Sequence, residues 1–156
     1  MSADDEPAPA MLSVRLGGID VGLPASAVRE IVRAVSITPL PAGPAILEGV
    51  VNVRGTLVPV VDVRRRLGMA PRTLDADEFL VILESGGRTL AIRVDDVDDL
   101  VSIEPGQAHS SDELSPALRH LAGLGALSDG TVVIYDPAAF VTQAEAEAID
   151  AAVAAA

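Results

Sequence analysis

The sequence contains no cysteine and few aromatic side chains. Without thiols the chain can form no disulfide framework, thiolate nucleophile or sulfur-ligated metal site, which fits a reducing cytosol. Its aromatic residues are one tyrosine and two phenylalanines, so no row of rings is available for stacking nucleic-acid bases. Because 49% of the residues are hydrophobic, we expect a core built from Val, Leu, Ile and Ala.

Basic residues are also scarce. The 11 basic residues stand against 23 acidic ones, which gives a formal net charge of −12. That field repels a phosphate backbone and an anionic membrane surface, so we expect no nucleic-acid partner. No apolar run reaches the ~18 residues of a spanning helix, so we expect no direct membrane insertion. Residues 1–10 are acidic and proline-rich, lack the features of a secretion signal, and are expected to form a disordered lead-in.

Short apolar runs separated by turn residues predict β-hairpins along most of the chain. Gly17-Gly18 lies between two such runs, and glycine tolerates the positive φ of tight turns. Arg54-Gly55 and Gly86-Gly87 divide two further pairs of strand-like runs. In the second strand of the Arg54-Gly55 pair, Pro59 suggests a sheet edge or a bulge, because proline cannot donate to the ladder.

One segment shows helical spacing instead. The positions i, i+3, i+4 and i+7 are occupied by Val28, Ile31, Val32 and Val35. This spacing predicts an apolar helix face. A short basic helix is also predicted from Val63 to Leu67, with Asp62 as its N-cap and Gly68 as its stop.

The plan of the first half recurs in the second half. The hairpin of residues 49–62 has a counterpart at residues 123–136, and the offset of roughly 70 to 75 residues suits a duplicated small lobe. The sequence therefore predicts a mainly β domain over residues 11–150, with two antiparallel lobes at approximately 11–75 and 76–140. Small lobes of this kind close as barrels, because closure removes exposed strand edges. Thr142 and Glu145 match a capping box, so we expect a C-terminal helix over residues 143–153 that packs back on the lobes.

Clusters that could support catalysis are weak. The acidic run Asp95–Asp99 lacks the internal glycine and distal glutamate of a calcium loop, and we interpret it as a solvated acidic turn around Val97. The residue types of a hydrolase triad occur at residues 109–112, but neighbours in sequence rarely have triad geometry, and no nucleophile elbow exists. Gly123 and Gly125 do not form a phosphate loop. We therefore predict no enzyme activity, no catalytic residue, no metal site and no cofactor, and a binding role follows by elimination.

Arg54 lies at a predicted hairpin tip, and its role is open from the residues alone. Its guanidinium could pin the turn to Glu48 or Asp62, or it could face a partner. The basic cluster at residues 64–66 is equally open, between favourable charge at a helix end and a binding role.

The run from Gly49 to Arg64 closely resembles the signature of the CheW family: Gly, two apolar residues, Asn-apolar-Arg-Gly, then Pro-apolar-apolar-Asp-apolar-Arg. The resemblance extends to residues 22–31, to residues 94–97 and to residues 121–125. It covers nearly everything from Met11 to Ile149.

This resemblance implies two intertwined five-stranded SH3-like β-barrels on a shared hydrophobic core. It also implies an adaptor that couples chemoreceptor cytoplasmic tips to the regulatory domain of a CheA-like histidine kinase, in the cytoplasm at membrane-associated receptor arrays. Carried over residue by residue, it places Val28, Arg54 and Val97 in the receptor groove. The matched positions near receptor or kinase contacts are Glu30 and Gly49, and the structural signature residues are Asn52, Gly55, Pro59 and Asp62.

Two other functions remain open at this point. Within the same fold, the chain could be a kinase regulatory-domain fragment or a CheV-like coupling protein, although its own Met1 and the lack of a following receiver motif favour a free-standing adaptor. A different class would be a small acidic metal-binding hydrolase that uses Asp95–Asp99 with His109.

Overall fold

The computed structural model describes residues 10–34, 36–71, 73, 75–102, 124–126, 132–134, 137 and 141–156. Ten β-strands dominate these residues, as the mainly β prediction requires. The strands are β1 (Ala10–Leu16), β2 (Ile19–Pro24), β3 (Val28–Arg33), β4 (Leu47–Val53), β5 (Thr56–Val61), β6 (Phe79–Ser85), β7 (Arg88–Val94), β8 (Asp96–Ser102), β9 (Leu124–Ala126) and β10 (Val132–Ile134). The α-helices are α1 (Val63–Arg66) and α2 (Gln143–Ala154), and a 3-10 turn spans Ala25–Ala27.

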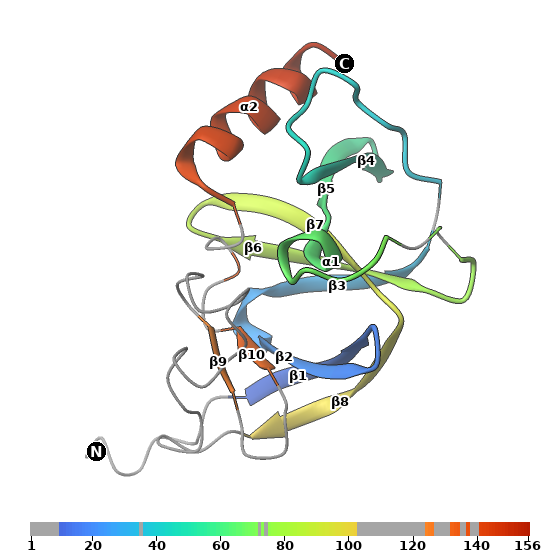
Figure 1. Ribbon diagram of the computed structural model, residues 1–156, viewed down its shortest axis with the longest axis vertical. Coiled ribbons are helices and arrows are strands. Elements are labelled where there is room, and N and C mark those ends of the chain that lie inside the picture. Colours follow the sequence, from blue (N-terminus) through green and yellow to red (C-terminus); the bar gives the residue numbers. More distant parts are fainter. Residues whose placement is uncertain are drawn as a thin grey trace.

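The strands form two five-stranded sheets that exchange chain segments. The first sheet has the order β8-β1-β2-β10-β9, and the second has the order β3-β6-β7-β5-β4. Figure 1 shows the second sheet in the upper half of the molecule, the first sheet below it, and α2 above the second sheet. The first sheet thus combines the start of the chain with its end, so a division into residues 11–75 and 76–140 does not separate the two sheets. The chain crosses between the sheets at residues 25–27 and again at Asp95.

The three predicted hairpin turns are confirmed. Gly17 and Gly18 have φ of 58° and 87°, and Gly86 and Gly87 have φ of 62° and 77°. Two successive positive φ angles match the twist of the flanking strands, which is why two-residue hairpins favour them. The same pattern recurs at Arg54 and Gly55, with φ of 51° and 86°.

The predicted helix after the first hairpin is wrong. Val28, Ile31 and Val32 lie in β3, which pairs antiparallel with β6, and Val35 lies outside the described residues. Side-chain burial alternates along β3 with a period of two. β-branched residues pack well on a pleated surface, and the ladder with β6 decides the outcome over a short window. The acidic segment that begins at Asp96 is likewise a strand, β8, and not a turn.

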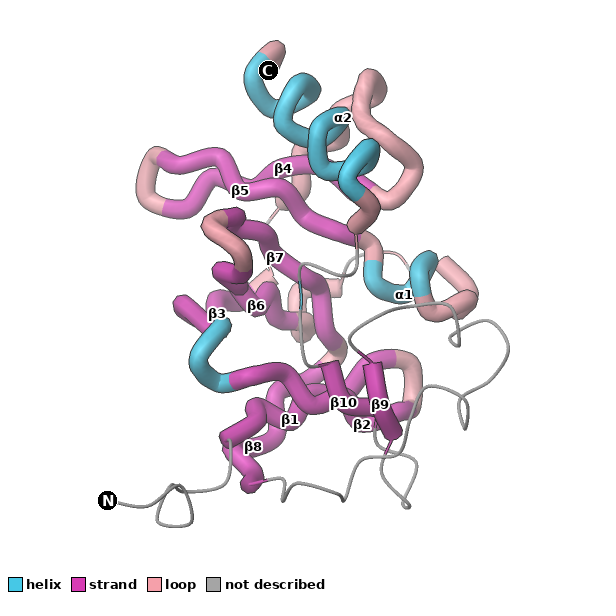
Figure 2. The backbone as a smooth tube through the Cα atoms, turned by 90° about the vertical axis from the view of Figure 1, so that its left-hand side faces the viewer, coloured by secondary structure: helices cyan, strands magenta, loops and turns pink. Residues whose placement is uncertain are grey.

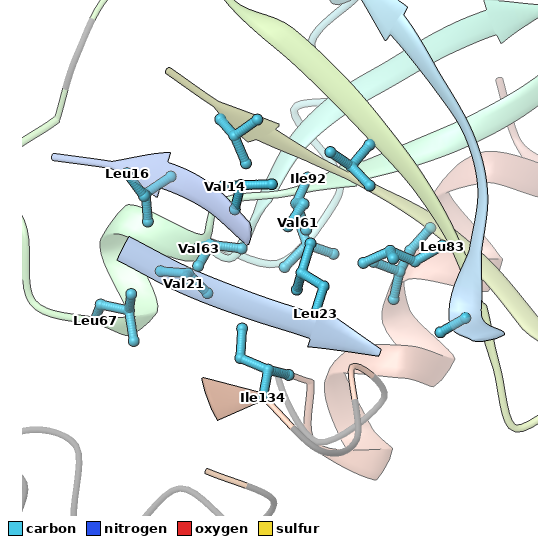
Figure 3. Packing of buried hydrophobic residues seen from close by; sticks show 14 of the residues in the cluster. Val14, Leu16, Val21, Leu23, Val61, Val63, Leu67, Leu83, Ile92 and Ile134 are labelled. Atoms are coloured by element: carbon cyan, nitrogen blue, oxygen red, sulfur yellow. The ribbon is translucent and has the colours of Figure 1, made fainter. Parts of the chain in front are cut away.

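Both sheets bury one shared aliphatic core. Figure 3 shows Val14 and Leu23 of the first sheet packed with Val61, Leu83 and Ile92 of the second. A smaller cluster lies on the other face of the second sheet, formed by Val51, Val58, Val60, Leu80, Ile82 and Ala91. Because successive strand residues point to opposite faces, the apolar stretches at residues 60–61 of β5, 80–83 of β6 and 90–92 of β7 contribute side chains to both clusters.

The second sheet approaches closure at its edges. Thr38, which follows edge strand β3, forms a bridge with Val50 of edge strand β4, and the two backbone N–H···O bonds both measure 2.9 Å. Pro59 sits in β5, where it faces Val50, while the ladder between β5 and β7 covers only Val60 and Val61. The strand is central, but proline occupies a stretch that has no partner on the β7 side.

Two helices lie beside the second sheet, and each begins at a side-chain cap. Asp62 caps α1 as predicted: its side chain accepts a 3.0 Å hydrogen bond from Arg65 N, and Gly68 follows with φ of 76°. At α2, Thr142 Oγ1 accepts from Glu145 N at 3.0 Å, and Thr142 N donates to Glu145 Oε1 at 2.8 Å. This confirms the capping box.

Candidate partner-binding site

The tip of the β4–β5 hairpin presents Arg54 to solvent. Asn52 Oδ1 accepts a 2.7 Å hydrogen bond from Gly55 N, which fixes the turn from within. Arg54 is the one non-glycine residue with positive φ in the described part of the chain. Its side chain is 80% exposed, so the left-handed backbone displays the guanidinium outward and does not bury it.

Arg54 is paired with Glu30 and with neither of the carboxylates considered from the sequence. Its Nη1 lies 2.7 Å from Glu30 Oε2, and its Nη2 lies 3.2 Å from Glu30 Oε1. A bidentate pair of this kind fixes the plane of the guanidinium. Glu48 instead faces Arg93, and Asp62 caps α1. The structure therefore brings together two residues of the candidate site, 24 positions apart, on β3 and the hairpin tip.

Strand β3, which carries Glu30, also carries apolar residues. Val28 begins the strand, is partly buried, and packs against the shared core. Ile31 is 39% exposed and is one of two large exposed hydrophobic residues among those described, the other being Leu57. The helical interpretation had placed Ile31 on a buried face, and only the alternation along β3 reveals that it faces solvent.

Val97 lies on the other sheet. It is the second residue of β8, pairs with Val14 of β1, and packs partly buried against the same core as Val28. Both valines closely follow a crossing of the chain between the sheets, which places them where the two sheets meet. Arg54 and Glu30 belong to the second sheet alone.

Gly49 has a packing role in this structure. It is buried opposite Thr38, and a Cβ at this position would lie 2.2 Å from Thr38 O and 2.8 Å from Ile37 Cγ2. Only glycine lets the segment after β3 reach β4 and form the Thr38–Val50 bridge.

A buried ion pair joins both sheets near the second crossing. Arg64 of α1 pairs with Asp95, and their side chains are 8% and 20% exposed. Asp95 Oδ2 also accepts a 2.8 Å hydrogen bond from Gly17 N in the β1–β2 turn. The prediction of a solvated acidic turn around Val97 is therefore wrong for Asp95, whose carboxylate is engaged by Arg64 and Gly17. Two members of the basic cluster at residues 64–66 thus form ion pairs within the chain. Arg64 pairs with Asp95, and Arg66 pairs with Glu145 at 2.5 Å.

The structure contains a second buried cluster of charged residues, which the sequence did not predict. Arg93 Nε lies 3.1 Å from Glu78 Oε2, and Arg93 Nη1 lies 3.4 Å from Glu48 Oε2. Burial raises the pKa of Glu48, and the nearby Arg93 only partly offsets this effect. No sequence signal connects these residues, because β4, β7 and the residue before β6 meet only in the folded sheet.

A hollow of about 460 Å³ lies between β5, the β6–β7 turn and the end of α2. Leu57 and Pro59 line one side. On the other side Arg88 and Asp150 form a bidentate pair, with N–O distances of 2.5 and 3.1 Å. The guanidinium and the carboxylate on this side of the hollow therefore neutralise each other's charge.

The arrangement offers surfaces for binding, and no reactive constellation is assembled among the described residues. Within those ranges, no group of three or more His, Asp or Glu side chains could hold a metal ion. Asp95 is engaged with Arg64 and Gly17, whereas His109, the triad-like residues 109–112 and Gly123 lie outside the described residues. In the part of the chain that is described, no helix is long and apolar enough to cross a membrane.

Comparisons with known proteins agree with this description. The family model for the CheW-like domain matches residues 10–145. The chain is 28% identical to a chemotaxis protein CheW of Klebsiella aerogenes, over 86% of this chain and 82% of that protein. It is 27% identical to a probable chemotaxis protein CheW of Rhizobium etli, over 88% and 90% of the two chains. The crystal structure of the scaffolding protein TtCheW from Thermoanaerobacter tengcongensis superposes with a TM-score of 0.74 at 24% identity, covering 92% and 94% of the chains.

The two interleaved five-stranded sheets, together with the match to the structure of a scaffolding protein, define the fold class. The match over residues 10–145 identifies the protein further: the chain belongs to the CheW-like family. It is accordingly a chemotaxis coupling scaffold and not an enzyme.

Proposed function

We propose that this chain couples the cytoplasmic tips of chemoreceptors to the regulatory domain of a CheA-like histidine kinase, at membrane-associated receptor arrays in the cytoplasm. The observation that carries the proposal is the bidentate pair between the exposed Arg54 and Glu30 of β3, the strand that also carries Val28 and the exposed Ile31. Val28, Arg54 and Val97 form the receptor-binding set, and Glu30 and Gly49 are assigned to receptor or kinase contacts.

The binding chemistry follows from the shapes of the partners. A receptor tip is a helical hairpin, and a helix docks in a groove through apolar side chains at i, i+3 and i+4. The partly buried Val28 and Val97 would receive those anchors where the two sheets meet. Arg54 would contribute a charge-assisted hydrogen bond to an acidic residue of the tip, in competition with Glu30 or alongside it.

Kinase binding uses a different feature of the molecule. The kinase regulatory domain has the same architecture, so its sheets can form heterologous contacts with this chain that close as rings when the rotation permits. Each contact can be weak, because repetition in an array supplies avidity. Ile31 is the exposed apolar residue of an edge strand and fits such a contact.

The test is a binding titration with a receptor cytoplasmic fragment and with the kinase regulatory domain from the same source. Arg54→Glu should weaken receptor binding by at least tenfold, equivalent to about 1.4 kcal/mol. Arg65→Glu is the matched control, because Arg65 is an exposed arginine on α1 and its reversal changes the net charge by the same amount. Equal loss in both variants would show a general charge effect and would contradict the proposed contact.

Two further variants separate binding from folding. Arg54→Gly removes the guanidinium at a position whose φ of 51° suits glycine, so it should weaken binding while keeping the fold. Val28→Asp should weaken receptor binding while the chain keeps its fold. Unfolding of Val28→Asp would instead assign Val28 to core packing, and binding of Val28→Ala would then decide whether it contacts the receptor.

A further inference from the structure

The buried pair of Arg64 and Asp95 stands at the point where the chain passes from β7 of the second sheet to β8 of the first. We propose that Arg64 and Asp95 are positioning residues that fix the angle between the two sheets, and thereby fix where Val97 stands relative to Val28. The binding part of this inference rests on the proposed function, whereas its geometric part does not.

Asp95 connects three elements at once. One carboxylate oxygen pairs with Arg64 of α1, and the other accepts the 2.8 Å bond from Gly17 N of the β1–β2 turn. The backbone N–H of Asp95 donates to Arg15 O at 2.8 Å. A single residue therefore ties the first hairpin of the first sheet to the helix that follows β5 of the second sheet.

The turn is packed directly against the guanidinium. A Cβ on Gly17 would lie 3.2 Å from Arg64 Nη1 and 2.8 Å from Met69 Sδ. Met69 in turn packs against the shared core. Gly17 is packed tightly against Arg64 and Met69, so the first hairpin cannot tilt towards α1 without displacing Arg64.

A polar contact suits this task better than more apolar packing. The hydrophobic effect that holds the shared core is non-directional, so apolar burial alone does not demand one angle between the sheets. A buried ion pair adds little net stability because its charges lose hydration, but its hydrogen bonds demand one geometry. Val97 is two residues beyond Asp95, so its position depends directly on the orientation that the pair sets.

The first test measures geometry without any partner. The chain contains no cysteine, so cysteines placed at the exposed Thr89 of β7 and Asp98 of β8 accept two spin labels uniquely. Pulsed dipolar spectroscopy then reports the distance between the sheets. Asp95→Asn and Arg64→Met should shift or widen the distance distribution by more than about 2 Å, the scale of small element shifts.

The control is Ile149→Val, which trims the shared core at α2 and leaves the ion pair in place. Its distance distribution should match that of the unmutated chain, even though its stability falls. If Arg64→Met does not fold, Arg64→Lys keeps the charge and loses the second donor arm. An unchanged distribution in both Asp95→Asn and the Arg64 variant would overturn the inference.

The second test measures binding of the receptor fragment. Asp95→Asn should lose roughly tenfold in affinity, and Ile149→Val less than about twofold, because a displaced site residue costs binding that a small loss of stability does not. Equal losses in the two variants would refute the positioning role. If the unmutated chain binds no receptor fragment, the proposed function fails, and the distance measurement alone decides whether the pair sets the sheet angle.

Discussion

Arg54 combines a backbone conformation suited to glycine with a side chain that faces solvent. Its φ of 51° carries a strain that the neighbouring Gly55 does not, and Asn52 holds the turn closed. A non-glycine residue at such a position is informative, because the fold would be easier to form with glycine. The exposed bidentate pair between its guanidinium and Glu30 adds at most about 1 kcal/mol of stability, so stability alone does not account for an arginine at this position.

Gly49 gives a prediction about packing. Gly49→Ala places a methyl group 2.2 Å from Thr38 O, so the segment after β3 must move away from β4. We expect a loss of about 1–3 kcal/mol in the free energy of unfolding, as in other overpacked sites. Gly55→Ala is the control, because nothing lies within 4 Å of its Cβ and only the positive φ is unfavourable. Urea unfolding measures both, and a smaller loss for Gly49→Ala would contradict the packing role.

Glu48 gives a prediction about pH. Burial raises its pKa above the usual 4.5, despite the nearby Arg93. The folded state then binds this proton more tightly than the unfolded state does, so stability from Glu48 is present at low pH and is lost as pH rises from about 4.5 through the raised folded pKa.

The test replaces Glu48 with a neutral isostere. Glu48→Gln should gain stability relative to the unmutated chain as pH rises from about 4 to about 7, because Glu48 becomes ionised over this range whereas the glutamine side chain stays neutral. Urea unfolding at both pH values measures the difference. A constant difference between the two proteins across this range would show that Glu48 has no raised pKa.

At the scale of elements, hairpins were predictable and β3 was not. A two-residue turn with glycine leaves a local signature, and Gly17-Gly18 and Gly86-Gly87 both carry it. In β3 the residues Val28, Ile31 and Val32 satisfy both a helical spacing and a strand, and the ladder with β6 decides between them. That ladder joins residues about 50 positions apart, so no local pattern contains it.

The N-terminal cap of helix α2 gives a prediction about pH. Burial acts to raise the pKa of Glu145, but the hydrogen bond from Arg66 and those within the capping box outweigh it and lower the pKa. Its stability contribution is therefore present above the unfolded pKa near 4.5 and is lost as pH falls through the lowered folded value.

Glu145→Gln should lower the free energy of unfolding by about 1 kcal/mol at about pH 7, a typical cost of a disrupted cap. The deficit should shrink as pH falls below 4.5, the usual pKa of this side chain. Glu147→Gln is the control on the same helix, because Glu147 lies outside the cap and receives a 3.2 Å bond from Gln143. Thermal unfolding followed by circular dichroism measures both variants, and an equal deficit for the two would argue against the cap.

For the whole molecule, the family resemblance named candidate site residues but did not predict how they meet. The motif pointed to Arg54, Glu30 and Val28, and the structure pairs Arg54 with Glu30. The contacts that join the two sheets were not predictable, because Arg64 and Asp95 are 31 positions apart and meet Gly17 only after both sheets have formed. Duplication suggested lobes that follow one another in sequence, whereas the chain returns to the first sheet after completing the second.

This exchange of segments predicts how the molecule unfolds. The first sheet needs β1 and β2 from the start of the chain and β8 to β10 from later (Figure 2). Both sheets bury the same core cluster. Neither fragment 1–77 nor fragment 78–156 contains a complete sheet, so each should lack a cooperative unfolding transition. Mixed together, the two fragments should recover the native circular dichroism spectrum, because the missing strands are then supplied in trans.

The intact chain should unfold in one transition that is the same by circular dichroism and by urea-dependent proteolysis, as expected for one cooperative core. Two separated transitions would mean that each sheet is stable without the other. A fragment that folds alone would also show that one sheet is stable without the other. In that case the shared core could not be what couples the β3 side of the molecule to the β8 side.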